Sequence, residues 1–394
     1  MKKTSVLYVN FAPYDNVGRI LDYLVENFPL VVHFSFDFHK MKTKSVTNLL
    51  KIYEDGKLKS QVQLFKLPTP EAVLFVSLPF IAVLIGVQLI WHVFKIYKRI
   101  GRLSIYFSVN AFTVWIGNLL RNAGMVEKTL FWVWDYYPPG YSDWYIRLAR
   151  WGYWKFDRWS TVSSDRVVFL NQKLEELRKE IGVLPKEKNY PVIPIGTNPR
   201  TLVKISNDGR VRMGHLGVLK KGQGLDLLFD HLKEFISFIP SLKIEIIGSG
   251  PDEKHFKERG ASYGELIKFH GFLEKMDELD QVMQHWDIGL ATYIPGKSNE
   301  SHWTDPSKIK AYISLGIPVI TTNVTDFSKE IEQEKAGIVL DYFKHGDFIK
   351  AVQNILSNME LYRRGSENLG KKYHYKTIYP ALFSGFSPKN GWLR

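Results

Sequence analysis

A serine and a lysine stand where a predicted helix begins, in the stretch from residue 305 to residue 320. Asp305 is of a type that caps helices, and Gly316 is suited to end the helix before a short apolar strand. A helix start presents free backbone N–H groups and a positive dipole end, to which Ser307 adds a hydroxyl and Lys308 an ammonium. The stretch predicts a phosphate-binding corner, with a plain capped surface helix as the alternative.

The composition indicates a chain with two domains and an anionic partner. Its 394 residues are 45% hydrophobic and 24% charged, which allows buried cores. It has no cysteine, which excludes disulfides, thiolate metal sites and cysteine nucleophiles. The formal charge is +13, and residues 1–190 hold 26 Lys and Arg against 16 Asp and Glu. The first half is therefore expected to face a phospholipid surface, a phosphorylated substrate or nucleic acid.

Short apolar strands alternate with helices in both halves of the chain. In the first half we expect strands at 6–9, 30–36, 62–67, 104–109, 129–134 and 166–170, and helices at about 18–27, 71–100, 111–122 and 143–159. In the second half we expect strands at 211–216, 242–247, 267–270, 287–291, 318–321 and 337–340, and helices at 223–238, 252–263, 275–285, 306–315, 327–334 and 346–357. This alternation predicts an α/β protein with parallel sheets.

Residues 72–94 form an apolar segment with no acidic or basic side chain for 23 residues, counting His92 as neutral. That length can span a bilayer. A span would separate residues 1–71 from the rest of the first sheet, so a buried or membrane-surface helix is favoured and a span is the alternative. A basic cluster follows at once, at Lys95, Lys98, Arg99 and Arg102. An apolar face beside such a cluster favours docking on anionic lipid.

Aromatic and basic residues also share one face of the predicted helix 143–159. Seven of the 11 tryptophans lie between residues 115 and 159. The face carries Arg147, Trp151, Trp154 and Arg158. Such a stripe suits the headgroup region of a bilayer. It equally suits the stacking of sugars or bases, or an ordinary core helix whose arginines reach the surface.

Several segments, in order and spacing, resemble GT-B glycosyltransferases of the family 4 type, over most of the chain and most strongly from residue 190 to 375. The segments are residues 194–198, 217–226, 246–251, 270–272, 287–291 and 305–320. The resemblance implies two Rossmann-like doubly wound domains facing a cleft. They are expected at 1–190, which binds the acceptor and associates with the membrane, and at 191–370, which binds the nucleotide-sugar. Residues 371–394 are expected to return to the first domain.

The resemblance also implies roles for individual residues of the second domain. The donor diphosphate is expected at Gly217, Lys220, Lys221, Gly248, Gly250, Asp305, Ser307 and Lys308, and the base and ribose near Gly271 and Phe272. For the glycines, turn geometry alone is the alternative. The pattern departs from the family at Val218, Gln223, Trp303 and Ala311, where the family carries arginine, lysine and two glutamates. Lys220 or Lys221, and Glu300, Asp305 or a main-chain group, are the candidates that replace them.

In the first half, residues 10–18 and 132–138 are similar to the acceptor loops of the family. The acceptor is expected near Gly18, Trp134, Tyr136 and Tyr137. Asp135 follows a buried strand amid aromatic side chains, where burial would raise its pKa and suit it to accept a hydroxyl proton. A turn cap is the alternative role for Asp135, and Asp15 is the second candidate base.

Together these features predict a metal-independent glycosyltransferase that moves a sugar from a nucleotide-sugar to a lipid-linked or cell-surface glycan precursor. It is expected in the cytoplasm, peripheral to the inner face of the membrane, with an anionic membrane surface as partner. No cofactor besides the nucleotide-sugar co-substrate, no metal site and no nucleic acid are expected. The alternatives are transfer to a soluble acceptor and a catalytically silent sugar-nucleotide-binding or scaffold protein. A nucleic-acid binder and a sugar-nucleotide epimerase are weaker readings.

Overall fold

The chain forms two compact units. The computed structural model describes residues 4–11, 16–36, 48–67, 74–134, 136–137, 143–200, 208–273, 276–344 and 346–386. Unit 1 comprises Met1–Pro194 and Ile378–Arg394, and unit 2 comprises Ile195–Thr377. The chain therefore rejoins unit 1 at Ile378, a few residues later than the expected residue 371.

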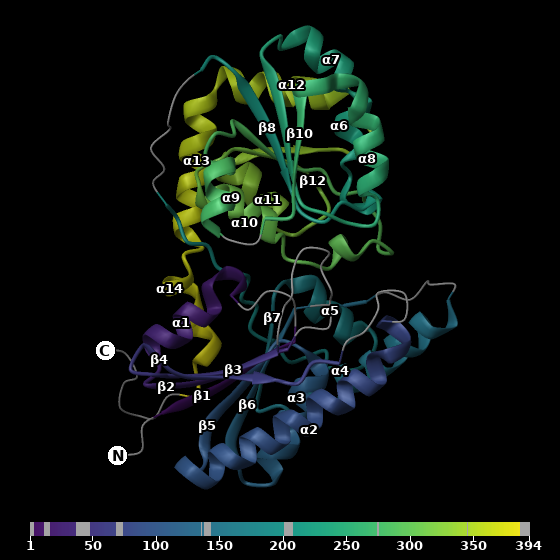
Figure 1. Ribbon diagram of the computed structural model, residues 1–394. Helices are drawn as coiled ribbons and strands as arrows, with labels where there is room; N and C mark the ends of the chain where they lie inside the picture. The colour runs from purple at the N-terminus through teal and green to yellow at the C-terminus, as the bar shows by residue number, and fades with distance from the viewer. Residues whose placement is uncertain are drawn as a thin grey trace. The chain divides into compact units, whose positions relative to one another are not determined.

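Unit 1 is built on a seven-stranded sheet in the order β4-β3-β2-β1-β5-β6-β7 (Figure 1). The strands are β1 (Ser5–Phe11), β2 (Leu30–Phe36), β3 (Asn48–Glu54), β4 (Lys57–Leu64), β5 (Leu103–Ser108), β6 (Val126–Val133) and β7 (Arg166–Phe169). The helices are α1 (Ile20–Asn27), α2 (Leu74–Ile100), α3 (Ala111–Asn122), α4 (Trp144–Ser163) and α5 (Gln172–Glu180). Strands β2, β1, β5, β6 and β7 run parallel, as the alternation predicts.

An antiparallel hairpin of β3 and β4 forms one edge of this sheet, where a single strand at 62–67 was expected. The two strands are joined by Asp55 and Gly56, whose φ angles are 47° and 79°. Positive φ at both central residues is the mark of a two-residue hairpin turn whose twist matches the strands. The Asp-Gly pair is the sequence signal for this hairpin.

Helix α2 has two apolar faces, and its inner face belongs to the core of unit 1. The buried residues of that face are Ile81, Ile85, Leu89 and Val93, which join a cluster with side chains of β1 to β6 and α3. Gln88 fixes the helix to the end of the hairpin, because its amide accepts from Phe65 N at 2.8 Å and donates to Phe65 O at 3.0 Å. The helix therefore covers the sheet.

Matched substitutions on the two faces should separate core packing from surface exposure. We expect Ile85→Val to lower the free energy of unfolding by about 1 kcal/mol, because it removes a buried methylene. Ile85 is 1% exposed, whereas Ile90 on the other face is 42% exposed. The same change at Ile90 should alter stability by less than about 0.5 kcal/mol. Chemical denaturation measures both values, and equal values would contradict the inward orientation of Ile85.

Unit 2 is built on a six-stranded, wholly parallel sheet in the order β10-β9-β8-β11-β12-β13. The strands are β8 (Val211–Leu216), β9 (Leu242–Ile247), β10 (Ile267–Gly271), β11 (Ile288–Ala291), β12 (Val319–Thr322) and β13 (Gly337–Leu340). The helices are α6 (Asp226–Asp230), α7 (Leu232–Phe238), α8 (Glu253–Gly260), α9 (Met276–Met283), α10 (Ser307–Ser314), α11 (Ser328–Gln333), α12 (Gly346–Ser357), α13 (Met359–Lys372) and α14 (Tyr375–Ile378), which ends in unit 1.

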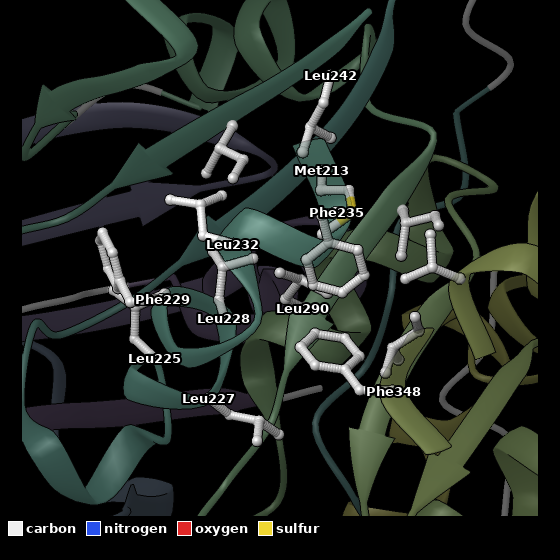
Figure 2. Packing of buried hydrophobic residues seen from close by; sticks show 14 of the residues in the cluster. Met213, Leu225, Leu227, Leu228, Phe229, Leu232, Phe235, Leu242, Leu290 and Phe348 are labelled. Carbon is white, nitrogen blue, oxygen red and sulfur yellow. The ribbon is translucent and has the colours of Figure 1, made fainter. Parts of the chain in front are cut away.

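Two apolar clusters show that helices cover both faces of the sheet in unit 2. One cluster packs the strands against α6, α7, α8 and α12, and Figure 2 shows its Phe235 and Phe348 rings near Met213 and Leu290. The other cluster packs the strands against α9, α10, α11 and α13. The expected helix 223–238 is divided into α6 and α7 at His231, whose φ of −100° and ψ of 5° interrupt the helix. The doubly wound prediction is confirmed for this unit.

Glycines inside the strands of unit 2 let aromatic rings lie directly on the sheet. A Cβ at Gly214 would come within 2.0 Å of the Trp286 ring, and one at Gly289 within 2.5 Å of the Tyr312 ring. Both rings are at most 1% exposed. The strands therefore carry glycine where a bulky aromatic ring packs directly on the backbone.

Candidate functional site

The carboxyl ends of β8 and β11 form the point in unit 2 where the order of strands reverses. The chain winds outward from β8 to β10 on one side and from β11 to β13 on the other. In open α/β sheets ligands bind at this position, because the loops after the two strands diverge. The Tyr312 hydroxyl ties the two strand ends together, accepting from Leu216 N at 2.9 Å and donating to Leu290 O at 3.1 Å.

Three glycines fix the loops that follow β8, β9 and β10. Gly217 N donates to Ile247 O at 2.9 Å, and Gly248 N donates to Gly271 O at 2.8 Å. The φ angles of the three glycines are 141°, 138° and 70°, which other residues rarely adopt. A Cβ at Gly248 would lie 1.8 Å from Gly217 O. The loops therefore pack backbone against backbone, and the glycines are needed for that contact.

Helix α10 begins beside this loop, but Asp305 does not cap it. The residue before the helix is Pro306, and no side chain caps the first turn. The Asp305 carboxylate instead accepts a hydrogen bond from Ile195 N at 2.7 Å, at the start of unit 2. Burial raises the pKa of Asp305, and Lys310, whose Nζ lies 3.9 Å away, opposes that rise. The capping prediction is therefore wrong, and Asp305 anchors the chain as it enters unit 2.

Lys310 supports that anchor from a buried aromatic site. Its Nζ lies 3.7 Å from the centre of the Phe327 ring and 3.6 Å from that of Tyr373. Burial lowers the pKa of Lys310 to about 8, while Asp305 and Glu330 oppose the shift. Cation–π contact compensates part of the lost hydration of a buried ammonium. Lys310 therefore stabilises the chain around Asp305.

The other end of α10 follows the sequence prediction. Gly316 has a φ of 65°, and Ile317 N donates to Tyr312 O at 3.0 Å. This is the left-handed glycine termination that closes the last turn of a helix. The N–H groups of the first turn remain without intrahelical acceptors, as in every α-helix. The Ser307 side chain beside them is exposed.

Lys308 lies at the switch point, buried beneath the glycine loop. It is 7% exposed, and its Nζ donates to Gln223 Oε1 at 2.9 Å. Its Cε and Nζ both lie 3.1 Å from the position that a Cβ on Gly217 would take, and its Nζ lies 5.0 Å from the centre of the Tyr293 ring. Burial lowers the pKa of Lys308 to about 7. An anion at this position would favour the ammonium form, because an opposite charge offsets the lost hydration.

If the diphosphate that the resemblance implies binds at Lys308, its affinity should depend on pH. Above about pH 7 the free Lys308 is increasingly neutral, so binding at that lysine must take up a proton, and Kd should rise about tenfold per pH unit. His215 should not contribute to this pH dependence, because burial and Lys308 hold its pKa well below the usual range. The phosphate itself titrates near pH 6. Calorimetry of nucleoside diphosphate binding, in buffers of different ionisation enthalpy, measures the proton uptake. A flat profile above pH 7 would contradict this role.

The remaining predicted cations lie farther toward solvent. Lys220 Nζ lies 3.2 Å from Glu300 Oε2, and both side chains are more than a third exposed. Lys221 is exposed, and its backbone N donates to Asp252 Oδ2 at 2.8 Å. The loop after β8 is joined to the loop after β11 by Asn299, whose Nδ2 donates to Gly222 O at 2.8 Å. Gln223 of the first loop and Tyr293 of the second thus contact Lys308, and Lys220 and Lys221 are exposed charges of the loop after β8.

Gly250 and Phe272 complete the predicted set in unit 2. A Cβ at Gly250 would lie 2.4 Å from Leu219 O, so Gly250 is required by the close approach of the two loops. Phe272 directly follows the end of β10 and is half-buried. The sequence did not single out Tyr293. Gln223, which stands where the family pattern has lysine, is marked by the sequence only as a departure from that pattern.

In unit 1, the two predicted bases, Asp135 and Asp15, lie outside the described residues. Gly18 has a φ of 60°, and its carbonyl accepts from the Tyr379 hydroxyl at 2.7 Å. Trp134 is 9% exposed. The positive φ and the carbonyl contact favour a structural role for Gly18, and the Trp134 side chain is buried.

Trp154 supports the aromatic segment at 136–137. Its Nε1 donates to Tyr137 O at 3.2 Å, and its ring stacks on Tyr136 at 6.4 Å. It is half-buried, whereas Arg147, Trp151 and Arg158 of the same predicted face are exposed. Trp154 thus contacts the segment 136–137 of unit 1, and the membrane role of the four residues stays a prediction.

The two units, each built on a Rossmann-like sheet, agree with the GT-B fold that the sequence predicts, and the comparisons support that fold. Residues 210–358 match the family described as Glycosyl transferases group 1. The sucrose-phosphate synthase of Thermosynechococcus elongatus is similar at 15% identity and a TM-score of 0.64, covering 96% of this chain and 99% of that one. Anabaena HepE in complex with UDP is similar at 13% identity and a TM-score of 0.63, covering 96% and 98%.

A third similar structure is the lipopolysaccharide outer core galactosyltransferase WaaB, at 12% identity and a TM-score of 0.57, covering 97% of this chain and 99% of that one. At these identities the likenesses show the fold. No curated protein matches the sequence significantly. The chain thus has the GT-B fold of these glycosyltransferases, and its residues 210–358 carry the match to the family described as Glycosyl transferases group 1.

Proposed function

We propose that the protein transfers a sugar from a nucleotide-sugar to a lipid-linked or cell-surface glycan precursor at the cytoplasmic face of the membrane. The proposal that the protein binds a nucleotide-sugar donor rests on the buried Lys308, which lies under the Gly217 loop beside the start of α10. Among similar proteins, HepE has been solved with UDP and with UDP-glucose. A uridine diphosphate sugar is therefore the first donor to test.

In the proposed reaction an acceptor hydroxyl attacks the anomeric carbon of the sugar, and the bond between that carbon and the diphosphate oxygen breaks. Lys308, the exposed Ser307 hydroxyl and the first N–H groups of α10 stabilise the negative charge on the departing diphosphate. Lys220 and Lys221 add cationic charge nearby, so no cofactor or metal is included in the proposal. Asp135 accepts the proton of the acceptor hydroxyl.

The proposed class of acceptor is supported by the charge and the apolar helix of unit 1 and by one similar structure. Unit 1 carries the excess positive charge of the chain and a helix, Val76–Ile100, that is long and apolar enough to cross a membrane, with a mean hydropathy of 2.0. WaaB is described as a lipopolysaccharide outer core galactosyltransferase. A protein with these features is proposed to act on an acceptor held at a membrane rather than free in solution.

Transfer of radiolabel from several nucleotide-sugars into a membrane lipid extract tests the proposal. Label in the organic phase, unchanged by a metal chelator, is the expected result. Label only in water-soluble glycans would overturn the lipid acceptor. Nucleotide binding without transfer or hydrolysis of any donor would favour the silent sugar-nucleotide-binding alternative, for which the missing glutamates at Trp303 and Ala311 are the argument.

A further inference from the structure

The outer face of helix α4 carries one line of exposed apolar side chains. The residues are Trp144, Leu148, Trp151, Trp159 and Val162, with exposed fractions of 65, 53, 57, 49 and 67%. At 3.6 residues per turn, their positions fall within about 80° of arc on the helix. Isolated apolar side chains on a surface are ordinary, whereas an apolar line along a helix, here interrupted only by the exposed Lys155, marks an interaction surface.

Helix α2 repeats this arrangement on the face opposite to its core contacts. The exposed residues of this face are Val76, Phe80, Val83, Val87, Ile90, Trp91 and Phe94, which lie within about 100° of arc. Phe80 and Val83 are 73% and 66% exposed. Helices α2 and α4 pack against each other in unit 1, and they lie side by side in Figure 1. The two apolar lines are therefore carried by neighbouring helices.

The charges on the two helices are cationic. Lys95 Nζ lies 4.7 Å from the centre of the Trp91 ring, and Lys98 Nζ lies 5.4 Å from that of Phe94. Arg147, Lys155 and Arg158 are exposed on α4. The sequence of α2 contains no acidic residue, and the one acidic residue of α4, Asp157, is buried.

The buried Asp157 leaves the outer face of α4 without negative charge. Its carboxylate accepts two hydrogen bonds from Arg178, at 2.6 and 3.1 Å. Aromatic rings beside ammonium groups, with no carboxylate between them, suit the boundary between lipid headgroups and acyl chains.

We propose that α2 and α4 together form a docking surface for an anionic lipid leaflet, with α2 lying along the membrane plane rather than crossing it. This inference builds on the proposed membrane location and specifies its surface. A second copy of the chain is the less suitable occupant, because a symmetric contact would bring the same cationic side chains together. A span is less suitable because it would withdraw Leu89 and its neighbours from the core of unit 1.

Vesicles of phosphatidylcholine with and without phosphatidylglycerol test the surface. We expect the full chain to cosediment with the anionic vesicles and only weakly with the neutral ones. The double variant Val83→Glu/Val87→Glu, and separately Trp151→Glu, should each lose at least about tenfold in partitioning. Lys98→Gln should lose about fivefold on anionic vesicles only. Phe343→Glu is the matched control, because Phe343 is a 71% exposed side chain of unit 2.

Three results would overturn the surface. Equal binding of the wild-type chain and the glutamate variants would remove α2 and α4 from the contact. Retention in the membrane after alkaline carbonate washing would indicate a span. A dimer in analytical ultracentrifugation that the same variants dissociate, without vesicle binding, would assign the surface to a second copy. The UDP-dependent thermal shift should be unchanged in every variant. If the wild-type chain binds anionic vesicles but transfers no sugar, the proposed reaction is wrong and the docking surface still stands.

Discussion

Replacement of Lys308 by methionine is expected to remove most of the thermal stabilisation that UDP gives the protein, with about a hundredfold loss of affinity. The buried ammonium of Lys308 would contact the diphosphate directly, and charge-assisted contacts of this kind contribute about 2–4 kcal/mol. Methionine fills a similar volume without an amine that must lose its hydration, so the ligand-free variant should melt at the same temperature or higher. Differential scanning fluorimetry with and without UDP measures both effects.

The control for this variant is Lys350→Met on α12, because the Lys350 side chain is 79% exposed. It should keep the full UDP shift. If UDP gives no shift with the wild-type chain, GDP and ADP extend the measurement to other nucleotides. An unchanged shift in the Lys308 variant would remove this lysine from the donor site and leave the fold assignment untouched.

Gly248→Ala is expected to destabilise unit 2 by more than about 4 kcal/mol, a loss that few single substitutions reach. The new Cβ would lie 1.8 Å from Gly217 O, a backbone atom that cannot rotate away. The φ of 138° is itself unfavourable for alanine. Relief of the clash would require the loops after β8 and β9 to separate, so UDP binding should be lost with the stability. Chemical denaturation followed by circular dichroism measures the change.

The variant Gly209→Ala measures the cost of a positive φ at alanine without the steric clash that is expected at Gly248. Gly209 has a φ of 73°, and a Cβ there would meet nothing within 4 Å. We expect a loss of only about 1 kcal/mol, the ordinary cost of a left-handed alanine. If the two alanine variants were equally stable, the contact between the glycine loops would not be a source of stability.

The strands of unit 2 could be predicted from sequence because each is a short apolar run, as parallel strands covered on both faces must be. Strands β8, β9 and β13 occupy the expected residues 211–216, 242–247 and 337–340. Helix α5 was not expected, because its sequence is strongly polar. Asn171 holds its start by accepting a hydrogen bond from Leu174 N at 3.0 Å.

The site was predictable where its chemistry is local and unpredictable where it depends on tertiary contacts. Lys308 stands out because the serine, the lysine and the helix start are adjacent in the chain. Gln223 and Tyr293 do not, because each meets Lys308 only through the fold. Asp305 was assigned to the wrong partner for the same reason, since the N–H group that it accepts from belongs to Ile195, 110 residues away.

The inner face of α2 has a practical consequence for anyone who wishes to purify this protein without detergent. Deletion of the apolar segment, the usual remedy for a presumed membrane anchor, would strip the cover from the first sheet and expose its apolar strands to aggregation. Polar residues placed only at positions such as Phe80, Val83 and Val87 would leave that cover in place. Solubility and folding should then be separable within a single helix.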